Sequence, residues 1–316
     1  MKISVVVTCF NEERYIEECI KSITKQSIYH SIDEIFVVDD GSTDNSFKIL
    51  ERLNTEIEKL NVIKTKGVGV SKARNIGIKS TKNEFIALLD ADDFWHKDKL
   101  KNQIGAFNYD KSIGLVYGDY WDFSKEDASD SKLVKVKAFN LKFKNHLKEY
   151  FLYDAPIIPS ATIYRRKALF SSGLYNENLK FYEDCELNLR ISENWNFFYV
   201  SGGLIYKRKK ENQITARLDK LINNVFIISD ISAKRNPFLK KYIKNRNSRY
   251  LYKSALDCYF RHKEKKKTLE HSINAIKTNP LNFKACLLII MIMLPYNANL
   301  TIYNFLKKLF YKFRSK

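Results

Sequence analysis

A repeated order of segments in the first half of the chain constrains the fold most strongly. Short apolar runs rich in β-branched residues lie at residues 3–8, 34–38 and 84–89. Between them, apolar residues recur at the three- and four-residue spacing of a helix. Continuous apolar runs of this kind are typical of strands buried on both faces of a parallel sheet. The alternation predicts an α/β fold in which helices cover both faces of a mostly parallel sheet.

The remaining elements are expected from the same patterns. Asn11 is expected to cap the first helix, with Glu12 and Glu13 in its first turn, where the helix dipole favours acidic side chains. Residues 125–150 are charged and irregular, which predicts a loop. Further strands are expected at residues 61–64, 115–123, 157–164 and 195–205, and later helices at residues 184–192, 218–232, 247–262, 267–277 and 301–314.

Charge separates the end of the chain from the rest. Residues 217–316 hold 22 Lys and Arg against five Asp and Glu, which accounts for nearly all of the net charge of +19. We therefore expect two parts, an α/β domain over residues 1–216 and a basic helical region over residues 217–316. An excess of this kind indicates an anionic partner, either nucleic acid or an acidic membrane surface.

The cysteines and the apolar runs bear on the cellular setting. Five scattered cysteines without CxxC spacing predict neither a zinc site nor a disulfide framework, and they fit a reducing, cytosolic setting. The apolar run at the N-terminus is too short for a signal peptide. No run reaches the roughly 20 apolar residues that a membrane-spanning helix needs.

An acidic cluster, Asp90-Ala91-Asp92-Asp93, follows the strand expected at residues 84–89. Carboxylates this close repel one another unless a cation or solvent offsets their charge. The end of a strand would direct all three into a shared cleft. Oxygen ligands of this type suit Mg²⁺ or Mn²⁺, which take one or two protein carboxylates and complete their shell with phosphate and water. The alternative for such a cluster is a solvated acidic turn.

Three further polar clusters are candidates for binding a nucleotide. Asp40, after the second strand, could accept a hydrogen bond from the N–H of a uracil ring, although residues 39–44 could equally form a plain turn. Phe10, at the end of the first strand, could stack on a base or belong to the core. Lys72 and Arg74 offer positive charge and planar hydrogen bonding, or form a solvated basic helix face.

An acidic pair, Glu183-Asp184, opens the helix expected at residues 184–192. A carboxylate at this point could act as the general base that deprotonates an acceptor hydroxyl. Acidic residues are also common at the start of a helix, where they stabilise it without any catalytic role.

Taken in order, these clusters resemble a family 2 glycosyltransferase of the GT-A (Rossmann-like) fold, over about residues 1–215. A glycosyltransferase moves a sugar from a nucleotide-sugar donor to an acceptor hydroxyl. The motifs that carry the resemblance lie at residues 4–12, 37–44, 69–75, 89–93 and 183–190.

The resemblance implies a role for each matching residue. Asp90 and Asp92 would handle the ribose and a diphosphate-bound Mg²⁺ or Mn²⁺, with Asp92 in direct contact with the metal. Asp184 would be the catalytic base, and Glu183 would help to position the acceptor. Base binding would fall to Thr8, Phe10, Asp40 and Arg74, and the donor-binding set would also include Glu12, Lys72 and Ala91.

The resemblance further implies the course of the reaction. A single in-line displacement would invert the anomeric carbon, so no protein nucleophile is needed. A QxxRW stretch, which marks processive synthases, is absent from the sequence, and one sugar per encounter is expected. The donor is expected to be a UDP-sugar, because Asp40 and Arg74 suit a pyrimidine base. A dTDP-sugar would satisfy the same two contacts. The sugar is expected to be of hexosyl or N-acetylhexosaminyl type.

One position departs from the family pattern. Members often carry a histidine after the last strand that can reach the metal, whereas Lys210 stands near that position here. The third protein ligand of the metal is therefore not assigned, and Lys210 or Arg208 is a candidate for contacting the diphosphate instead.

The C-terminal segment at residues 301–316 has the pattern of a helix that lies in a membrane interface, with aromatic and aliphatic residues on one face and lysines around it. A terminal helix packed on the domain is the alternative. No nucleic-acid-binding module accompanies the charge, so no nucleic-acid partner is expected. With the family resemblance, this implies a cytoplasmic protein, peripheral at the inner face of the membrane, that acts on a glycan or lipid-linked glycan in bacterial surface polysaccharide assembly.

Two other classes of nucleotide-binding enzyme lack support in the loop after the first strand. A nucleotidyltransferase or a dinucleotide oxidoreductase would be expected to carry a glycine-rich loop after the first strand, and residues 8–12 contain no glycine. A catalytically inactive, membrane-attached protein that binds sugar nucleotides on the same fold stays an alternative.

Overall fold

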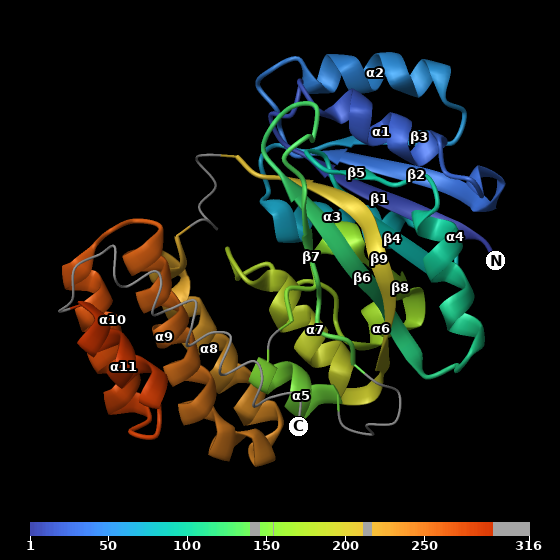
Figure 1. Cartoon of the computed structure of the whole chain (residues 1–316). Helices are drawn as coiled ribbons and strands as arrows, with labels where there is room; N and C mark the ends of the chain where they lie inside the picture. Colours follow the sequence, from blue (N-terminus) through green and yellow to red (C-terminus); the bar gives the residue numbers. More distant parts are fainter. Residues whose placement is uncertain (140–145, 154, 211–216, 293–316) are drawn as a thin grey trace. The chain divides into compact units, whose positions relative to one another are not determined.

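The computed structural model describes residues 1–139, 146–153, 155–210 and 217–292. The chain separates into two compact units, Met1–Gln213 and Ile214–Lys316 (Figure 1). The first unit is built around one sheet, and the second, where it is described, is built from helices.

The described part of the first unit contains a nine-stranded sheet with the order β3-β2-β1-β4-β8-β6-β9-β5, and β7 pairs with β6. Strands β1 to β4 run parallel, as do β6 and β9, whereas β8 is antiparallel to both of its neighbours. The expected α/β fold with a largely parallel sheet is therefore confirmed. The strands are β1 Ile3–Cys9, β2 Ile32–Asp39, β3 Leu60–Lys64, β4 Phe85–Asp90, β5 Phe94–Trp95, β6 Ile113–Phe123, β7 Lys132–Val134, β8 Ile163–Arg165 and β9 Asn196–Arg208.

Helices α1 and α2 lie on one side of the parallel strands and α3 lies on the other (Figure 1). This placement follows from the strand order, because right-handed crossovers from β1 to β2 to β3 run in one direction and the crossover from β3 to β4 runs back. The helices of the first unit are α1 Ile16–Thr24, α2 Ser46–Glu56, α3 Val70–Ser80, α4 Lys99–Ile104, α5 His146–Tyr153, α6 Arg166–Ser171 and α7 Glu183–Asn194.

The centre of the core is β1, whose apolar side chains are buried on both faces. Its register places Thr8 opposite Val38 on one side and Asp90 on the other. The carboxyl ends of β1, β2 and β4 therefore meet at one edge of the sheet, where ligands of such folds bind.

The expectation that Asn11 caps the first helix is wrong. Helix α1 begins five residues later, at Ile16, and the acidic residues of its first turn are Glu17 and Glu18. Asn11 instead adopts a left-handed backbone conformation (φ 56°), and its side-chain oxygen accepts a hydrogen bond from the Thr43 N–H at 2.8 Å. The residue thus ties the loop after β1 to the loop after β2.

Two further segments differ from their expectation. Residues 125–150, expected to be a loop, contain β7 and the start of α5 in their described part. Residues 157–164, expected to be a strand, contain a 3-10 turn at Pro159–Ala161 and only the first residues of the short β8. Proline lacks the backbone donor that a ladder needs, which explains why this strand starts late.

The described part of the second unit is helical. Helices α8 Leu218–Arg235, α9 Ile243–Phe260 and α10 Lys265–Thr278 coincide with three expected helices, and α11 Phe283–Ile292 was not expected. Ala255, Tyr259 and Leu288 form a small core between α9 and α11. Within residues 217–292 and the other described ranges, no helix is both long and apolar enough to cross a membrane. The helix expected at residues 301–314 lies outside the described residues.

The packing of α3 on the sheet depends on Gly77. A Cβ atom at this position would lie 2.4 Å from Cγ1 of Val6 and 3.2 Å from Cγ2 of Val38, both of which are buried in the sheet. We expect Gly77→Val to lower the free energy of unfolding of the first unit by about 1–3 kcal/mol, because neither strand can move aside cheaply.

Urea unfolding followed by tryptophan fluorescence measures this change, because Trp95, Trp121 and Trp195 all belong to the first unit. The control is Gly105→Val, since a Cβ at Gly105 meets nothing within 4 Å. Equal unfolding midpoints for the two variants would contradict this account of the α3 contact.

Candidate active site

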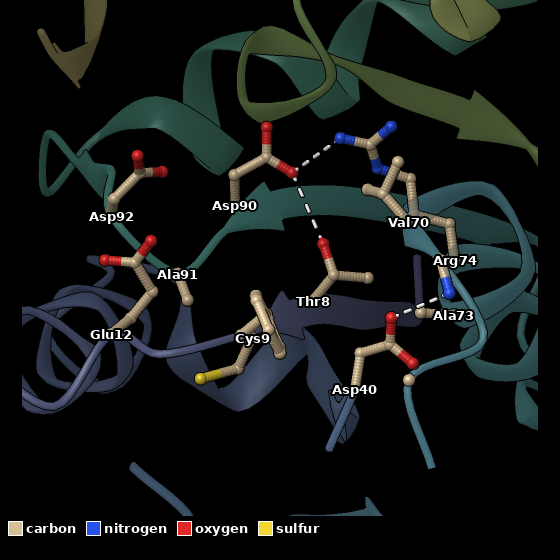
Figure 2. Close-up of a pocket in the computed structure, with 13 residues that line it drawn as sticks. Thr8, Cys9, Glu12, Asp40, Val70, Ala73, Arg74, Asp90, Ala91 and Asp92 are labelled. Carbon is tan, nitrogen blue, oxygen red and sulfur yellow. Dashed lines mark hydrogen bonds and ion pairs between the residues drawn. The ribbon is translucent and has the colours of Figure 1, made fainter. Parts of the chain in front are cut away.

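A cavity of about 580 Å³ opens at the carboxyl edge formed by β1, β2 and β4 (Figure 2). The residues of the donor-binding and metal-binding sets that line it are Thr8, Phe10, Glu12, Asp40, Arg74, Asp90, Ala91 and Asp92. They come from segments as far as 84 residues apart, so the structure brings together most of the set expected from the sequence.

Lys72 is not among the residues that line the cavity. It lies on the exposed side of α3, while Arg74 of the same helix is buried. Residues two positions apart on a helix point in nearly opposite directions, so the two could not both face the cavity. The expectation that Lys72 binds the nucleotide together with Arg74 is therefore not supported by its position.

The structure adds lining residues to which the sequence analysis gave no role: Cys9, Gly67, Gly69, Val70 and Ala73. Gly67 and Gly69 have positive φ angles of 76° and 91°, which favour glycine. The sequence could have indicated this loop, because two glycines between the end of β3 and the start of α3 are typical of a backbone that approaches a ligand closely.

Asp40 shapes this glycine-containing loop. Its carboxylate accepts hydrogen bonds from the backbone N–H groups of Val68 (2.7 Å) and Gly69 (2.8 Å) and from the Thr65 hydroxyl (2.5 Å). Gly41 follows in the left-handed region, and a Cβ there would lie 2.8 Å from the backbone nitrogen of Gly67. Asp40 therefore holds this loop in place. Its Oδ2 accepts a single hydrogen bond in the described part of the chain and has the capacity to accept a second.

Phe10 lies at the mouth of the cavity with 54% of its surface exposed. The sequence left open whether this aromatic ring belongs to the core or faces a ligand. The structure places it outside the core, where its ring is accessible for stacking.

Arg74 joins two acidic residues that are distant in the sequence. Its guanidinium donates to Oδ1 of Asp90 at 2.8 Å and to Oε1 of Glu183 at 2.7 Å, and it lies 5.3 Å from the centre of the Tyr175 ring. The residue is 5% exposed. Burial opposes the charge, but Asp90, Tyr175 and Glu183 outweigh it and raise the pKa of Arg74 well above its usual value.

The three carboxylates of the 90–93 cluster do not share one cleft, which corrects the expectation. Asp90 and Asp92 line the cavity, whereas Asp93 is buried away from it. Asp93 accepts hydrogen bonds from the Ser160 hydroxyl at 2.6 Å and from the Arg208 N–H at 3.0 Å. Burial, and then the charges of Asp92 and Asp90, raise the pKa of the Asp93 carboxyl well above its usual value. Asp93 therefore anchors the end of β9 to the cluster.

Lys210 stands beside Asp92. Its ammonium lies 3.0 Å from Oδ2 of Asp92 and also pairs with the carboxylate of Glu12. Burial opposes the charge, but the two carboxylates outweigh it and raise the pKa of Lys210. Burial raises the pKa of Glu12, which the contact with Lys210 partly offsets.

The carboxylates suit a divalent cation that relies on its substrate for part of its ligand shell. Oδ2 of Asp90 and Oδ1 of Asp92 make no hydrogen bond within the described residues, and Mg²⁺ or Mn²⁺ needs one or two such oxygens. The described ranges contain one group of three side chains whose possible metal-ligand atoms all lie within 4.8 Å of one another, and it belongs to the second unit: Asp219, Cys258 and Glu264. Its two carboxylates, those of Asp219 and Glu264, already pair with Arg217 and Lys267.

The acidic pair expected to act on the acceptor opens helix α7, as the sequence indicated. Neither Glu183 nor Asp184 lines the cavity itself, but Glu183 is linked to Asp90 through Arg74. The residue before the pair, Tyr182, has a left-handed backbone conformation (φ 59°), which turns the chain sharply into the helix. Both residues of the pair are half-buried.

Comparison with known proteins agrees with this geometry. The model of glycosyl transferase family 2 matches residues 4–170. The chain is 30% identical to the poly(ribitol-phosphate) beta-N-acetylglucosaminyltransferase TarS of Staphylococcus aureus, over 68% of this chain and 37% of the relative. It is 35% identical to the glycosyltransferase GlyG of Streptococcus pneumoniae, over 67% of this chain and 72% of the relative.

Solved structures show the same architecture. TarS 1–349 in complex with UDP-GlcNAc superposes with a TM-score of 0.63 at 20% identity, covering 92% of this chain and 84% of that structure. A mannosyltransferase from Pyrobaculum calidifontis in complex with GDP-Man and Mn²⁺ superposes with a TM-score of 0.57 at 16% identity, covering 91% of this chain and 85% of that structure.

The fold and the position of the cavity at the carboxyl edge of its sheet define a protein of the GT-A architecture. The chain belongs to glycosyl transferase family 2. It spans just over a third of the length of the TarS relative, so the activity of that whole protein does not pass to this chain by similarity alone.

The bridge made by Arg74 gives a stability prediction. We expect Arg74→Met to lower the free energy of unfolding of the first unit by about 3–5 kcal/mol, because it leaves two carboxylates in a largely buried site without their cation. Arg74→Lys should recover only part of the loss, since an ammonium cannot reproduce the two-armed geometry.

The matched control is Arg52→Met. Arg52 also joins two carboxylates, those of Glu17 and Glu56, but the group is exposed to solvent and should contribute little. Urea unfolding of all three variants makes the comparison. Similar midpoints for Arg74→Met and Arg52→Met would refute the structural role given to the bridge.

Proposed function

We propose that this chain is an inverting, metal-dependent glycosyltransferase that moves one sugar from a UDP-sugar, or alternatively a dTDP-sugar, to a hydroxyl of a glycan or lipid-linked glycan in bacterial surface polysaccharide assembly. The observation that carries the proposal is the cavity at the carboxyl edge of the sheet, where Asp40, Arg74, Asp90 and Asp92 converge. The poly(ribitol-phosphate) acceptor named for the TarS relative supports a surface polymer or its precursor as the acceptor.

The base of the donor would bind at the Asp40 end of the cavity. Oδ2 of Asp40 has the capacity to accept from a pyrimidine N–H, and the exposed ring of Phe10 is available for stacking. The UDP-GlcNAc bound by the TarS structure supports a uridine donor and a sugar of hexosyl or N-acetylhexosaminyl type. Thr8, Glu12 and Ala91 would complete the walls of this site.

The diphosphate would lie toward Asp90 and Asp92. A divalent cation held there, chiefly by Asp92, would neutralise the charge that develops on the departing diphosphate. Arg74 fixes the orientation of Asp90 by donating to its Oδ1. The hydroxyl of Thr8 donates a longer hydrogen bond, of 3.4 Å, to the same oxygen. The carboxylates therefore enter the reaction already oriented, which lowers the cost of binding the donor in a reactive geometry.

Asp184 would deprotonate the acceptor hydroxyl as it attacks the anomeric carbon from the face opposite the diphosphate. Its neighbour Glu183 is held by Arg74, which also holds Asp90. One guanidinium thus connects the donor side to the first turn of α7, and Glu183 would position the acceptor from there.

The donor screen is the direct test. Incubating the protein and Mn²⁺ with a panel of nucleotide-sugars, followed by mass spectrometry, should show hydrolysis or transfer for a UDP-sugar or dTDP-sugar and loss of turnover with EDTA. Turnover of no donor together with an absence of UDP binding would refute the proposal. UDP binding without any turnover would favour the inactive binding protein instead.

The role of Asp184 has its own test. Asp184→Asn should lower kcat by about 10²–10⁴-fold, because a general base contributes on this scale, while the affinity for UDP stays unchanged. Glu193→Gln, in the last turn of the same helix, is the matched control and should keep wild-type kcat. Full transfer activity in Asp184→Asn would remove this residue from the mechanism.

We further propose that the protein works in the cytoplasm, attached peripherally to the inner face of the membrane. The charge of residues 217–316 supports this, as does the amphipathic pattern at residues 301–316. The protein should bind vesicles containing anionic lipid, and the binding should weaken as salt rises. Removing residues 301–316 should abolish it.

Vesicle sedimentation measures this binding, with neutral vesicles as the lipid control. UDP binding by the truncated chain shows that the first unit is still folded. If the truncated chain sediments with anionic vesicles as well as the full chain does, the segment is not the anchor.

A further inference from the structure

The proposed metal ligand Asp92 already has a cation beside it. The Lys210 ammonium lies 3.0 Å from Oδ2 of Asp92 and pairs at the same time with Glu12. Lys210 lies just after β9, Asp92 lies in the turn after β4, and Glu12 lies in the loop after β1. All three side chains are partly buried, with exposures of 31%, 18% and 15% for Lys210, Asp92 and Glu12, so solvent screens the pair only in part.

The protein therefore supplies two cations to the acidic groups of the site, and they differ in kind. Arg74 is 5% exposed, lies within helix α3 and holds Asp90 with a rigid, two-armed group. Lys210 lies two residues after the end of β9 and carries a compact charge on a flexible stem. Arg74 is a fixed part of the structure, whereas the ammonium of Lys210 can exchange one anionic partner for another.

This difference matters for how a divalent cation reaches Asp92. In the donor-free protein, a divalent cation held by Oδ1 of Asp92 or Oδ2 of Asp90 would lie beside the ammonium that is paired to Oδ2 of Asp92, and the two positive charges would repel each other. A nucleoside diphosphate offers new acceptor oxygens of higher charge than one carboxylate. Once Lys210 turns to those oxygens, its charge no longer opposes a divalent cation at Asp92, and both oxygens of Asp92 can serve as ligands.

We infer that Lys210 is a positioning residue that couples the two ligands: it holds Asp92 in the donor-free protein, moves to the diphosphate when the donor binds, and so makes the binding of divalent cation and donor cooperative. The inference rests on the proposed function.

Lys210→Met tests the inference, because methionine keeps an unbranched stem and removes the charge. The measurement is Mn²⁺ binding, followed by electron paramagnetic resonance of free Mn²⁺, with and without saturating UDP. We expect Lys210→Met to bind Mn²⁺ about fivefold or more tightly than the wild type in the absence of UDP. The factor by which UDP tightens Mn²⁺ binding should fall by a similar amount, since the lost charge no longer links the sites.

Two variants serve as controls. Lys210→Arg keeps a positive charge at the position and should restore most of the coupling. Lys209→Met removes the same charge from the neighbouring residue, which pairs with Asp122 at 2.8 Å, and should behave as the wild type.

The outcomes separate this inference from the proposed function. If the wild type binds UDP and Mn²⁺ but Lys210→Met shows the same coupling, the role of Lys210 is overturned and the proposed function stands. If the wild type binds and turns over donor equally well without any divalent cation, Lys210 replaces the metal rather than exchanging with it. This outcome overturns the inference and the metal dependence of the proposed function, while the glycosyltransferase activity itself stands. If the wild type binds neither UDP nor dTDP, the proposed function itself fails.

Discussion

The position of β1 between β2 and β4 is the constraint on which the rest of the first unit depends. Parallel pairing on both sides brings Thr8, Asp39 and Asp90 to one edge of the sheet, although these residues are far apart in the sequence. A parallel sheet requires crossover helices, and the buried Gly77 allows one of them, α3, to approach β1 closely. Because α3 lies that close, Arg74 of the same helix can reach Asp90. The site is thus a consequence of how the core packs.

Acidic groups at the site are held in pairs by cations of the protein itself. Arg74 joins Asp90 to Glu183, and Lys210 joins Asp92 to Glu12. Carboxylates gathered at one edge would otherwise repel one another and destabilise the fold. Arg74 is buried and rigid, and its ion pairs stabilise the fold. Lys210 is partly exposed and flexible, so under the inference above a bound ligand can change its ion pairs.

The relatives and the solved structures agree with the residues of the cavity, but they support different statements: the relatives show the family, and the solved structures show the fold. The family model and GlyG place the chain in glycosyl transferase family 2, and the solved structures share its fold at 20% identity or less. The exposed ring of Phe10 and the remaining acceptor capacity of Asp40 are features of the free site that suit a pyrimidine nucleotide.

The sequence by itself determined the alternation of strands and helices and the polar clusters at the strand ends, because both are local patterns of apolar spacing and strand composition. It also placed the start of α7 near Glu183-Asp184. It could not show that Asp93 turns into the core, that Lys72 faces away from the cavity, or that Asn11 bridges two loops instead of capping a helix. Those facts, and the sharing of Arg74 between Asp90 and Glu183, were decided by tertiary structure alone, because each depends on partners brought near by the packing of distant segments.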